Sequence, residues 1–133
     1  MSLERDLSNH RLVQAEQCLK EAKLLFDNDG YKGAANRAYY CALHSMRSLF
    51  ALERVDFKSH KAVMSHFREK YIKTRIFDVK LSRILTDLHI IRSGSDYDDN
   101  YNIERDELEQ HIVNAEEFLK AIKAYLERTA DDA

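Results

Sequence analysis

Residues that end helices and form turns are almost missing from this sequence. It has no proline, and its three glycines are Gly30, Gly33 and Gly94 among 133 residues. Because proline and glycine mark most tight connections, such a chain is expected to form a few long elements joined by few turns. This favours a bundle of helices over a β-sandwich or β-barrel, which need many turns.

Apolar residues recur at helical spacing in five stretches, which predicts five helices. The expected ranges are about 3–27, 31–54, 60–73, 77–92 and 103–128. In the last range the apolar residues step alternately by four and three, as in helices that pack nearly parallel. The spacing therefore predicts an all-α fold. We expect an up-and-down four-helix bundle with an additional short helix, forming a single domain over residues 1–133.

Three helix ends carry local signals. Asn28-Asp29-Gly30 is expected to end the first helix, because glycine readily takes the left-handed conformation found at helix ends. Ser93-Gly94-Ser95 is expected to end the fourth helix. Ser59 is expected to cap the third helix, with its hydroxyl accepting a backbone N–H.

The apolar segments are shorter than the roughly 20 residues needed to cross a bilayer. The N-terminal residues also lack the apolar run of a signal peptide. Cys18 and Cys41 lie inside apolar helical patterns. A disulfide between them fits the sequence, but buried thiols in a reducing compartment are the preferred interpretation. We therefore expect a cytoplasmic protein without membrane contact.

Charge is unevenly distributed along a chain whose net charge is only −2. Residues 57–94 carry 9 basic and 3 acidic groups, whereas residues 95–133 carry 4 basic and 12 acidic groups. Phe67, Tyr71 and Phe77 are interleaved with the basic residues and could stack on nucleic-acid bases. A solvated basic face is the alternative. The basic stretch consists of Lys58, His60, Lys61, Arg68, Lys70, Lys73, Arg75, Lys80 and Arg83.

The usual short motifs of enzymes and metal sites are absent from the sequence. It has no glycine-rich phosphate loop, no His-Glu-x-x-His, no Cys-x-x-Cys and no Gly-x-Ser-x-Gly. Its six histidines are scattered, and the Glu-x-x-His spacing of di-iron bundles is missing. The sequence therefore predicts no metal and no other cofactor.

One polar group adjoins the apolar stripe of the second helix. Arg37, Tyr40 and His44 are spaced by three and four residues, so they share one helical face. Polar groups beside a core are costly unless they hydrogen-bond to one another or to a ligand. They form either a network that locks two helices, or one wall of a cleft that receives phosphate or nucleotide.

A second polar group lies where the fourth helix is expected to end. Arg92 precedes Asp96, Tyr97, Asp98 and Asp99. An arginine at a helix C-terminus complements the helix dipole, and it could simply pair with Asp96. Because loops carry a large share of functional groups, ligand binding is the other interpretation.

Together these segments resemble the HEPN family (higher eukaryotes and prokaryotes nucleotide-binding domain), in its small stand-alone prokaryotic branch. The resemblance implies a helical bundle that forms a homodimer, for which the small-residue face from Ala34 to Tyr40 is a candidate. It also implies a nucleotidyltransferase partner in a toxin–antitoxin pair. The matching segments, within about residues 8–127, are Asn36-Arg37-Ala38-Tyr39-Tyr40 with His44, Lys58-Ser59-His60, Ile91-Arg92 and Asp96-Tyr97-Asp98-Asp99.

Many members of that family are metal-independent ribonucleases, whose hallmark is an arginine separated from a histidine by four to six residues. Arg92 matches the arginine, but Tyr97, Asp98 and Asp99 occupy the three positions open to the histidine. Cleavage without a metal needs a group with a pKa near neutral to move the 2′-hydroxyl proton. Tyrosine, with a reference pKa of about 10, suits this poorly. His44 or His60 could substitute from another helix.

The sequence thus predicts a nucleotide- or RNA-binding module in which Tyr97 stacks on a base or is modified. One alternative is a metal-independent ribonuclease toxin, in which Arg92 stabilises the phosphorane and His44 or His60 moves protons. The other is a non-catalytic interaction protein whose polar groups only fix helix register. The predicted binding residues are Arg37, Tyr40, His44, Arg92, Asp96, Tyr97 and Asp98.

Overall fold

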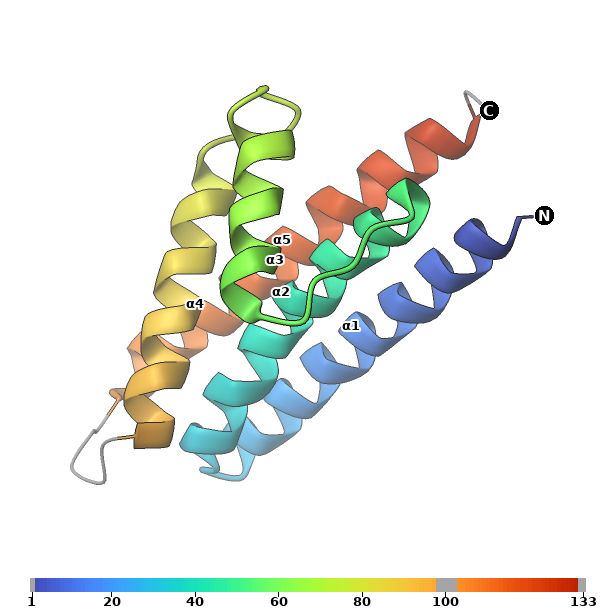
Figure 1. Ribbon diagram of the computed structural model, residues 1–133. Coiled ribbons are helices and arrows are strands. Elements are labelled where there is room, and N and C mark those ends of the chain that lie inside the picture. The colour runs from blue at the N-terminus through green and yellow to red at the C-terminus, as the bar shows by residue number, and fades with distance from the viewer. Residues whose placement is uncertain (1, 98–102, 132–133) are drawn as a thin grey trace.

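The computed structural model describes residues 2–97 and 103–131, and within these ranges it contains helices and no strand. A π-helical turn, η1 (Arg68–Ile72), continues the third helix. The described residues confirm the predicted all-α bundle of four long helices and one short one (Figure 1). The α-helices are α1 (Leu3–Asp27), α2 (Tyr31–Glu53), α3 (His60–Phe67), α4 (Lys80–Tyr97) and α5 (Arg105–Asp131).

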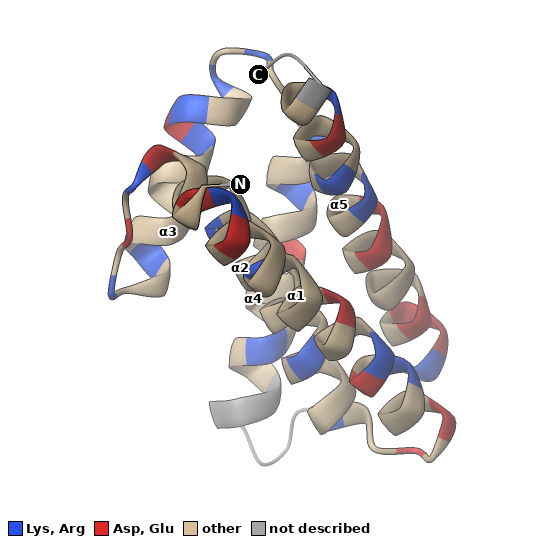
Figure 2. Ribbon diagram, turned by 90° about the vertical axis from the view of Figure 1, so that its right-hand side faces the viewer, with Lys and Arg blue, Asp and Glu red and all other residues tan. Residues whose placement is uncertain are grey.

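The central element is α2, which contacts each of the other four α-helices. Figure 1 shows α1 running down and α2 returning beside it, followed by α3 running up, α4 running down and α5 running up. Figure 2 shows acidic residues recurring along α5. Because α2 is covered on most sides, it can place side chains against α1, α3 and α4 at once.

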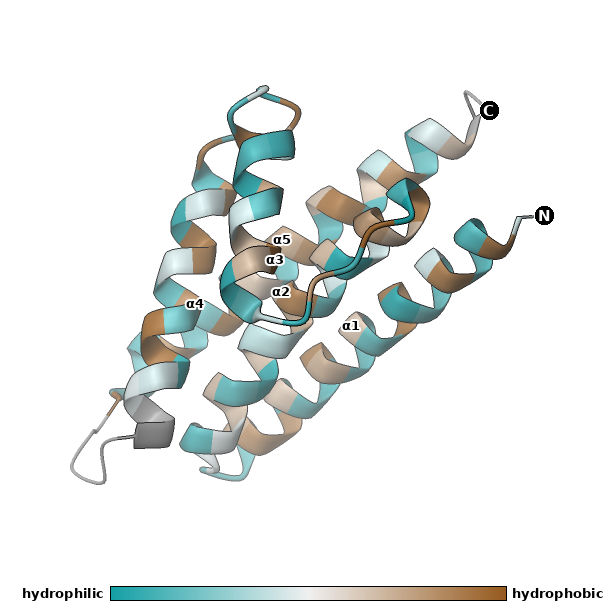
Figure 3. Cartoon of the chain, viewed as in Figure 1, coloured by the Kyte–Doolittle hydropathy of each residue, from teal (hydrophilic) through white to brown (hydrophobic). Residues whose placement is uncertain are grey.

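The predicted apolar stripes form one core. Apolar residues recur among polar ones along each helix (Figure 3), as expected of amphipathic helices with one apolar face. Each fully buried aliphatic side chain stabilises the fold by roughly 1.5–3 kcal/mol. Shortening fully buried Leu85 to alanine would cost about 2–5 kcal/mol. The buried stripes of α4 and α5 consist of Leu81, Ile84, Leu85, Leu88, Ile91, Leu108, Ile112, Ala115, Phe118, Leu119, Ile122 and Leu126.

The turn between α1 and α2 differs from the prediction. Asp29, not Gly30, takes the left-handed conformation, with φ 64°, whereas Gly30 has φ −84° and is the N-cap of α2. The amides of Asp29 and Gly30 donate to the carbonyls of Phe26 and Leu25 at 3.1 and 2.7 Å, a Schellman motif. Aspartate is among the few residues besides glycine that tolerate this conformation. Glycine at position 30 leaves room for Leu25, whose Cδ2 would lie 3.2 Å from an added Cβ.

The ends of α4 also differ from the prediction. The helix begins at Lys80 instead of near Phe77, and it continues through Gly94 to Tyr97, so the predicted break at 93–95 is wrong. Without proline, a glycine in a helix interior costs only about 1 kcal/mol, and a helix packed on the core tolerates that. Asp96 and Tyr97 therefore belong to the last turn of α4 instead of a loop. The side chains of residues 95–97, and Asp98 and Asp99 altogether, lie outside the described residues.

Other local predictions are confirmed. Ser59 caps α3, with its Oγ accepting from the amide of Ala62 at 3.0 Å. Cys18 and Cys41 are buried free thiols, and burial raises the pKa of both. Across the described ranges, every helix is too short or too polar to cross a membrane.

Candidate functional site

One stripe of α2 escapes full burial. It continues the predicted group beyond His44 by one more turn. A stripe of partly exposed polar residues on the most buried helix of the bundle is unusual, because such a helix normally packs apolar residues on all sides. Between Ala34 and Ala51, the residues that are not fully buried are Asn36, Arg37, Tyr40, His44 and Arg47.

The three residues predicted to share one face of α2 do so. The guanidinium carbon of Arg37 lies 5.0 Å from the ring centre of Tyr40. The rings of Tyr40 and His44 lie 6.1 Å apart. Arg37 also pairs with Glu21 of α1 at 3.5 Å. The α2 group is therefore held by a cation–π contact and a long ion pair.

His60 of α3 and Arg92 of α4 converge on the same part of α2. The ring of His60 lies 5.5 Å from that of Tyr39 and 5.6 Å from that of Tyr40. The guanidinium carbon of Arg92 lies 5.2 and 5.7 Å from the same two rings. Segments that are distant in the sequence thus meet around two adjacent tyrosines.

Two members of this group were not assigned a role from the sequence. Tyr39, only 1% exposed, lies at the centre, and its hydroxyl has no hydrogen-bond partner among the described residues. The ring of His89 lies 5.9 Å from that of Tyr39, and the buried Nδ1 of His89 also has no partner there. We call the whole group the tyrosine cluster; it comprises Arg37, Tyr39, Tyr40, His44, His60, His89 and Arg92.

A sequence signal existed for only one of the two. His89 precedes Arg92 by three residues, so helical spacing alone places both on one face of α4. Tyr39 stands among the buried alanines of α2, where it is indistinguishable from an ordinary core aromatic.

Electrostatics hold two histidines of the cluster in the neutral form. Burial and the charges of Arg47 and Arg37 lower the pKa of His44. Burial and the charge of Arg92 lower the pKa of His60. Since the reference value is about 6.5, both imidazoles are neutral at pH 7 and can accept a proton. Burial raises the pKa of Tyr39, so its phenol stays protonated and can donate.

The basic stretch does not offer aromatic rings to nucleic-acid bases, so that prediction was wrong. Phe67, Tyr71 and Phe77 are 0%, 4% and 7% exposed. Their ring centres lie 5.6 to 5.8 Å apart within the core. Of the predicted stretch, His60 is the residue that joins the tyrosine cluster. Lys70, Lys73 and Lys80 form ion pairs within the chain, with Glu53, Glu69 and Glu117.

A second polar cluster lies at the C-terminal end of α2. Glu53 Oε1 accepts from His66 Nε2 at 3.0 Å and from Lys70 Nζ at 2.6 Å, and Oε2 accepts from the Tyr71 hydroxyl at 2.6 Å. Burial alone would raise the pKa of Glu53, but the hydrogen bonds from Lys70, Tyr71 and His66 lower it. We call these four residues the Glu53 cluster.

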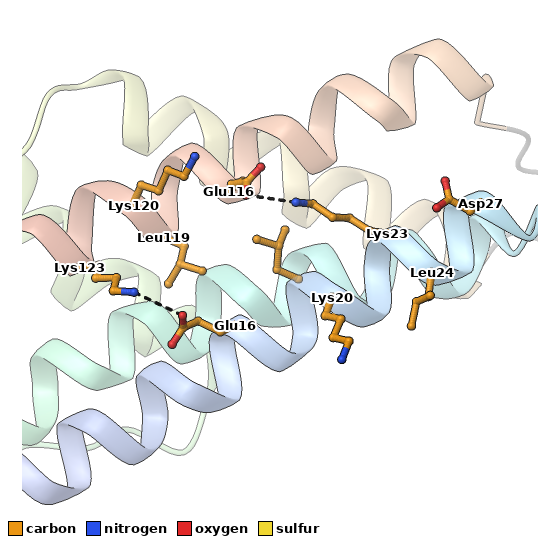
Figure 4. Close-up of a pocket in the computed structure, with 10 residues that line it drawn as sticks. Glu16, Lys20, Lys23, Leu24, Asp27, Glu116, Leu119, Lys120 and Lys123 are labelled. Carbon is orange, nitrogen blue, oxygen red and sulfur yellow. Dashed lines mark hydrogen bonds and ion pairs between the residues drawn. The ribbon is translucent and has the colours of Figure 1, made fainter.

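A groove of about 450 Å³ separates α1 from α5 (Figure 4). Leu19, Leu24 and Leu119 supply its apolar part. Two ion pairs bridge its sides, Lys23 with Glu116 at 3.1 Å and Lys123 with Glu16 at 3.4 Å. These ion pairs join α1 to α5 across the groove, as at an ordinary contact between two packed helices. Among the described residues, no three His, Cys, Asp or Glu side chains are grouped as a metal site would require.

Comparison with known proteins agrees with this architecture. "Putative toxin MJ0142" of Methanocaldococcus jannaschii is 28% identical over 115 residues, covering 86% of this chain and 78% of that protein. "UPF0332 protein" of Thermotoga maritima is 29% identical over 86% of each chain. "Putative toxin MJ0605" of M. jannaschii is 33% identical over 84% of this chain and 83% of its own length. The family model of the HEPN domain matches residues 8–125, and the chain therefore belongs to the HEPN domain family.

Proposed function

We propose that this protein binds a nucleotide or RNA through the tyrosine cluster. The observation that carries the proposal is the Tyr39 hydroxyl, which is buried without a partner among the described residues. Leaving a buried hydroxyl unpaired costs roughly 1–3 kcal/mol. A phosphate oxygen would accept from this hydroxyl and from a neighbouring guanidinium, so a bound phosphate would remove that cost.

The remaining residues of the cluster fit such a ligand. Arg37 and Arg92 approach the tyrosine rings from two different helices. Tyr40, which is only partly buried, can stack on a base. Asp96, Tyr97 and Asp98 stay predictions as further members of the site.

The test is binding of a labelled RNA oligonucleotide in the presence of EDTA. We expect Arg92→Gln to weaken binding about 10- to 100-fold, the usual effect of losing a hydrogen bond to a charged group. Arg83→Gln, an exposed arginine on the same helix, should bind like the unmodified protein. Equal affinity of Arg92→Gln and Arg83→Gln would contradict the proposal. It would favour the predicted alternative, an interaction protein whose polar cluster only fixes helix register.

A second candidate function is metal-independent RNA cleavage. The favouring observation is that His44 and His60, both neutral at pH 7, flank Tyr40 with ring distances of 6.1 and 5.6 Å. One histidine would take the proton of the 2′-hydroxyl as its oxygen attacks phosphorus. The imidazolium formed in this way would then give that proton to the departing 5′-oxygen, leaving a 2′,3′-cyclic phosphate, while Arg92 stabilises the charged phosphorane.

Product analysis tests this second function. Incubation with RNA and EDTA should give 2′,3′-cyclic phosphate ends, and His44→Gln or His60→Gln should reduce cleavage at least about 100-fold, as expected for loss of general acid–base catalysis. His10→Gln, an exposed histidine on α1, is the control. If the protein binds RNA without cleaving it, the second function fails and only the binding function remains.

We further propose that the protein acts as a homodimer in a toxin–antitoxin-like system with a nucleotidyltransferase partner. Two relatives carry the word toxin in their names; the dimer and the partner follow from the family resemblance. Ala34, Ala35 and Ala38, in the predicted dimer face, are fully buried within one chain, so a dimer must use another surface. A monomeric mass in light scattering would contradict the dimer. Co-purification with a co-expressed nucleotidyltransferase would support the partner.

A further inference from the structure

The unburied stripe of α2 extends past the tyrosine cluster. Arg37, Tyr40, His44 and Arg47 follow one another at intervals of three, four and three residues, so they line one side of the helix. At 1.5 Å of rise per residue, the stripe spans about 15 Å. This is longer than a single phosphate group requires.

Arg11 of α1 joins Arg47 at the far end of this stripe. The Nη1 of Arg11 donates to the backbone carbonyl of Arg47 at 3.1 Å. Both side chains are only partly buried. The charges of Arg47, Arg37 and Arg11 all act on His44, after burial, to lower its pKa. The two arginines therefore lie close enough to His44, in the middle of the stripe, for their charges to act on it.

The carboxylate beside these two arginines neutralises them only weakly. Asp56 lies 3.5 Å from Nη2 of Arg11 and 3.8 Å from Nε of Arg47. Charge-assisted hydrogen bonds are normally about 2.7–2.9 Å long. The side chain of Asp56 is 58% exposed, and the buried Nε of Arg47 makes no hydrogen bond among the described residues. A phosphate could therefore replace Asp56 at little cost.

We propose that Arg11 and Arg47 form a second phosphate subsite, so that the ligand of the tyrosine cluster is a strand of several nucleotides. One phosphate would lie near Arg37 and another between Arg11 and Arg47, with His44 beside the chain that joins them. At about 3.4 Å of advance per stacked nucleotide, 15 Å corresponds to about four nucleotides. This inference rests on the proposed function, because it extends the same site.

A structural role for the same arginines makes a different prediction. Arg47 also donates to the carbonyl of Phe57 at 3.2 Å, so the pair helps to hold the connection between α2 and α3. If that were its whole role, Asp56→Asn would loosen the connection and leave oligonucleotide binding unchanged or weaker. The subsite requires the opposite sign, since removing the carboxylate removes an anion that competes with phosphate.

The experiment measures how well AMP and oligoadenylates of two, four and eight nucleotides displace a labelled RNA oligonucleotide from the protein. Fluorescence anisotropy follows the displacement at low and at moderate salt. We expect affinity to rise at least about tenfold from AMP to the tetranucleotide and then to level off, with a steeper salt dependence for the longer ligands. Asp56→Asn should strengthen tetranucleotide binding about threefold, and Arg11→Gln should weaken it about tenfold, each with AMP affinity unchanged. Arg83→Gln should alter neither affinity.

Two outcomes would overturn the subsite while leaving the proposed function in place. The first is equal affinity for AMP and the tetranucleotide. The second is that Asp56→Asn binds the tetranucleotide more weakly and Arg11→Gln binds it normally. In that case both variants must also melt at the same temperature as the unmodified protein. If neither AMP nor any oligonucleotide binds, the proposed function itself fails.

Discussion

Two polar clusters made of the same kinds of residue lie along α2, and they differ in what completes them. In the Glu53 cluster, an imidazole, an ammonium and a phenol all contact one carboxylate. In the tyrosine cluster, the phenol of Tyr39 and Nδ1 of His89 have no hydrogen-bond partner among the described residues. Both clusters join α2 to the α3 region.

The difference lies in the carboxylate. Glu53 is 11% exposed and accepts three hydrogen bonds within the chain, so the cluster is closed and its interactions stabilise the fold. Tyr39 is more deeply buried, at 1% exposed, but its hydroxyl donor has no acceptor among the described residues. We therefore propose that the Glu53 cluster serves stability and the tyrosine cluster serves binding. The predictions below test that division.

The largest expected effect is on stability at the closed cluster. Glu53→Ala removes the shared acceptor and leaves His66, Lys70 and Tyr71 without it, so we expect a loss of about 3 kcal/mol in the free energy of unfolding. Urea denaturation measures this. Glu69→Ala, which breaks an exposed ion pair with Lys73, is the control and should cost no more than about 0.5 kcal/mol. RNA affinity of folded Glu53→Ala should be unchanged; a loss of affinity would contradict the division.

Removing one hydroxyl from each cluster should have opposite consequences. Tyr71→Phe loses the 2.6 Å bond to Glu53 and should destabilise the fold by about 1.5 kcal/mol. Tyr39→Phe removes an unpaired hydroxyl, so its stability should stay the same or rise by about 1 kcal/mol, while RNA affinity falls about tenfold. Thermal unfolding and anisotropy measure the two quantities. If Tyr39→Phe lowers stability and leaves affinity unchanged, Tyr39 is only a core residue.

The helices could be predicted because their signal is local. The stripe from Leu108 to Leu126 steps by four and three, and every member is buried. The helix ends were harder, because competing effects of similar size decide them. Gly94 continues α4 although glycine usually disrupts helices, and Asp29 takes the conformation expected of Gly30. Such outcomes depend on how strongly neighbouring turns are packed.

The candidate site could be predicted only where its residues share a helix or match a family pattern. Arg37, Tyr40 and His44 follow from spacing, and Arg92 from its place at the expected end of a helix. The roles of Arg92 and His60 in RNA cleavage came from the resemblance. Tyr39 required knowledge of how three helices pack around it. Phe67 shows the converse error: an aromatic among basic residues looked like a stacking surface but is fully buried. Sequence spacing gives the face of a helix, not what covers it.

A smaller effect should separate the clusters by pH. The pKa values of His44 and His60 are lowered in the folded protein, so the unfolded chain takes up protons first as pH falls below about 6.5. Stability from these residues is thus complete above that pH and is lost as pH falls through their folded pKa values. Bound phosphate favours the imidazolium, so RNA affinity should rise roughly fivefold from pH 7.5 to 6.

The carboxylate of Glu53 should not titrate in that range. The pKa of Glu53 is lowered from 4.5, so its contribution is complete above that value and is lost only in more acidic solution. Measuring affinity and melting temperature between pH 7.5 and 6 tests both statements. The double substitution His44→Gln with His60→Gln should flatten both curves. A pH dependence that survives it would assign the effect to other groups.

The smallest expected effects come from one cation in each cluster. Arg37 pairs with Glu21 at 3.5 Å, with both side chains partly exposed, so Arg37→Gln should change stability by no more than about 0.5 kcal/mol and weaken RNA binding about threefold. Lys70 donates to Glu53 at 2.6 Å but is 47% exposed, so Lys70→Gln should cost about 0.5–1 kcal/mol and leave binding unchanged. Urea denaturation and anisotropy on both variants complete the comparison. Equal losses of affinity in the two variants would mean that RNA binding depends on the overall positive charge of the protein. The tyrosine cluster would then not be the specific binding site.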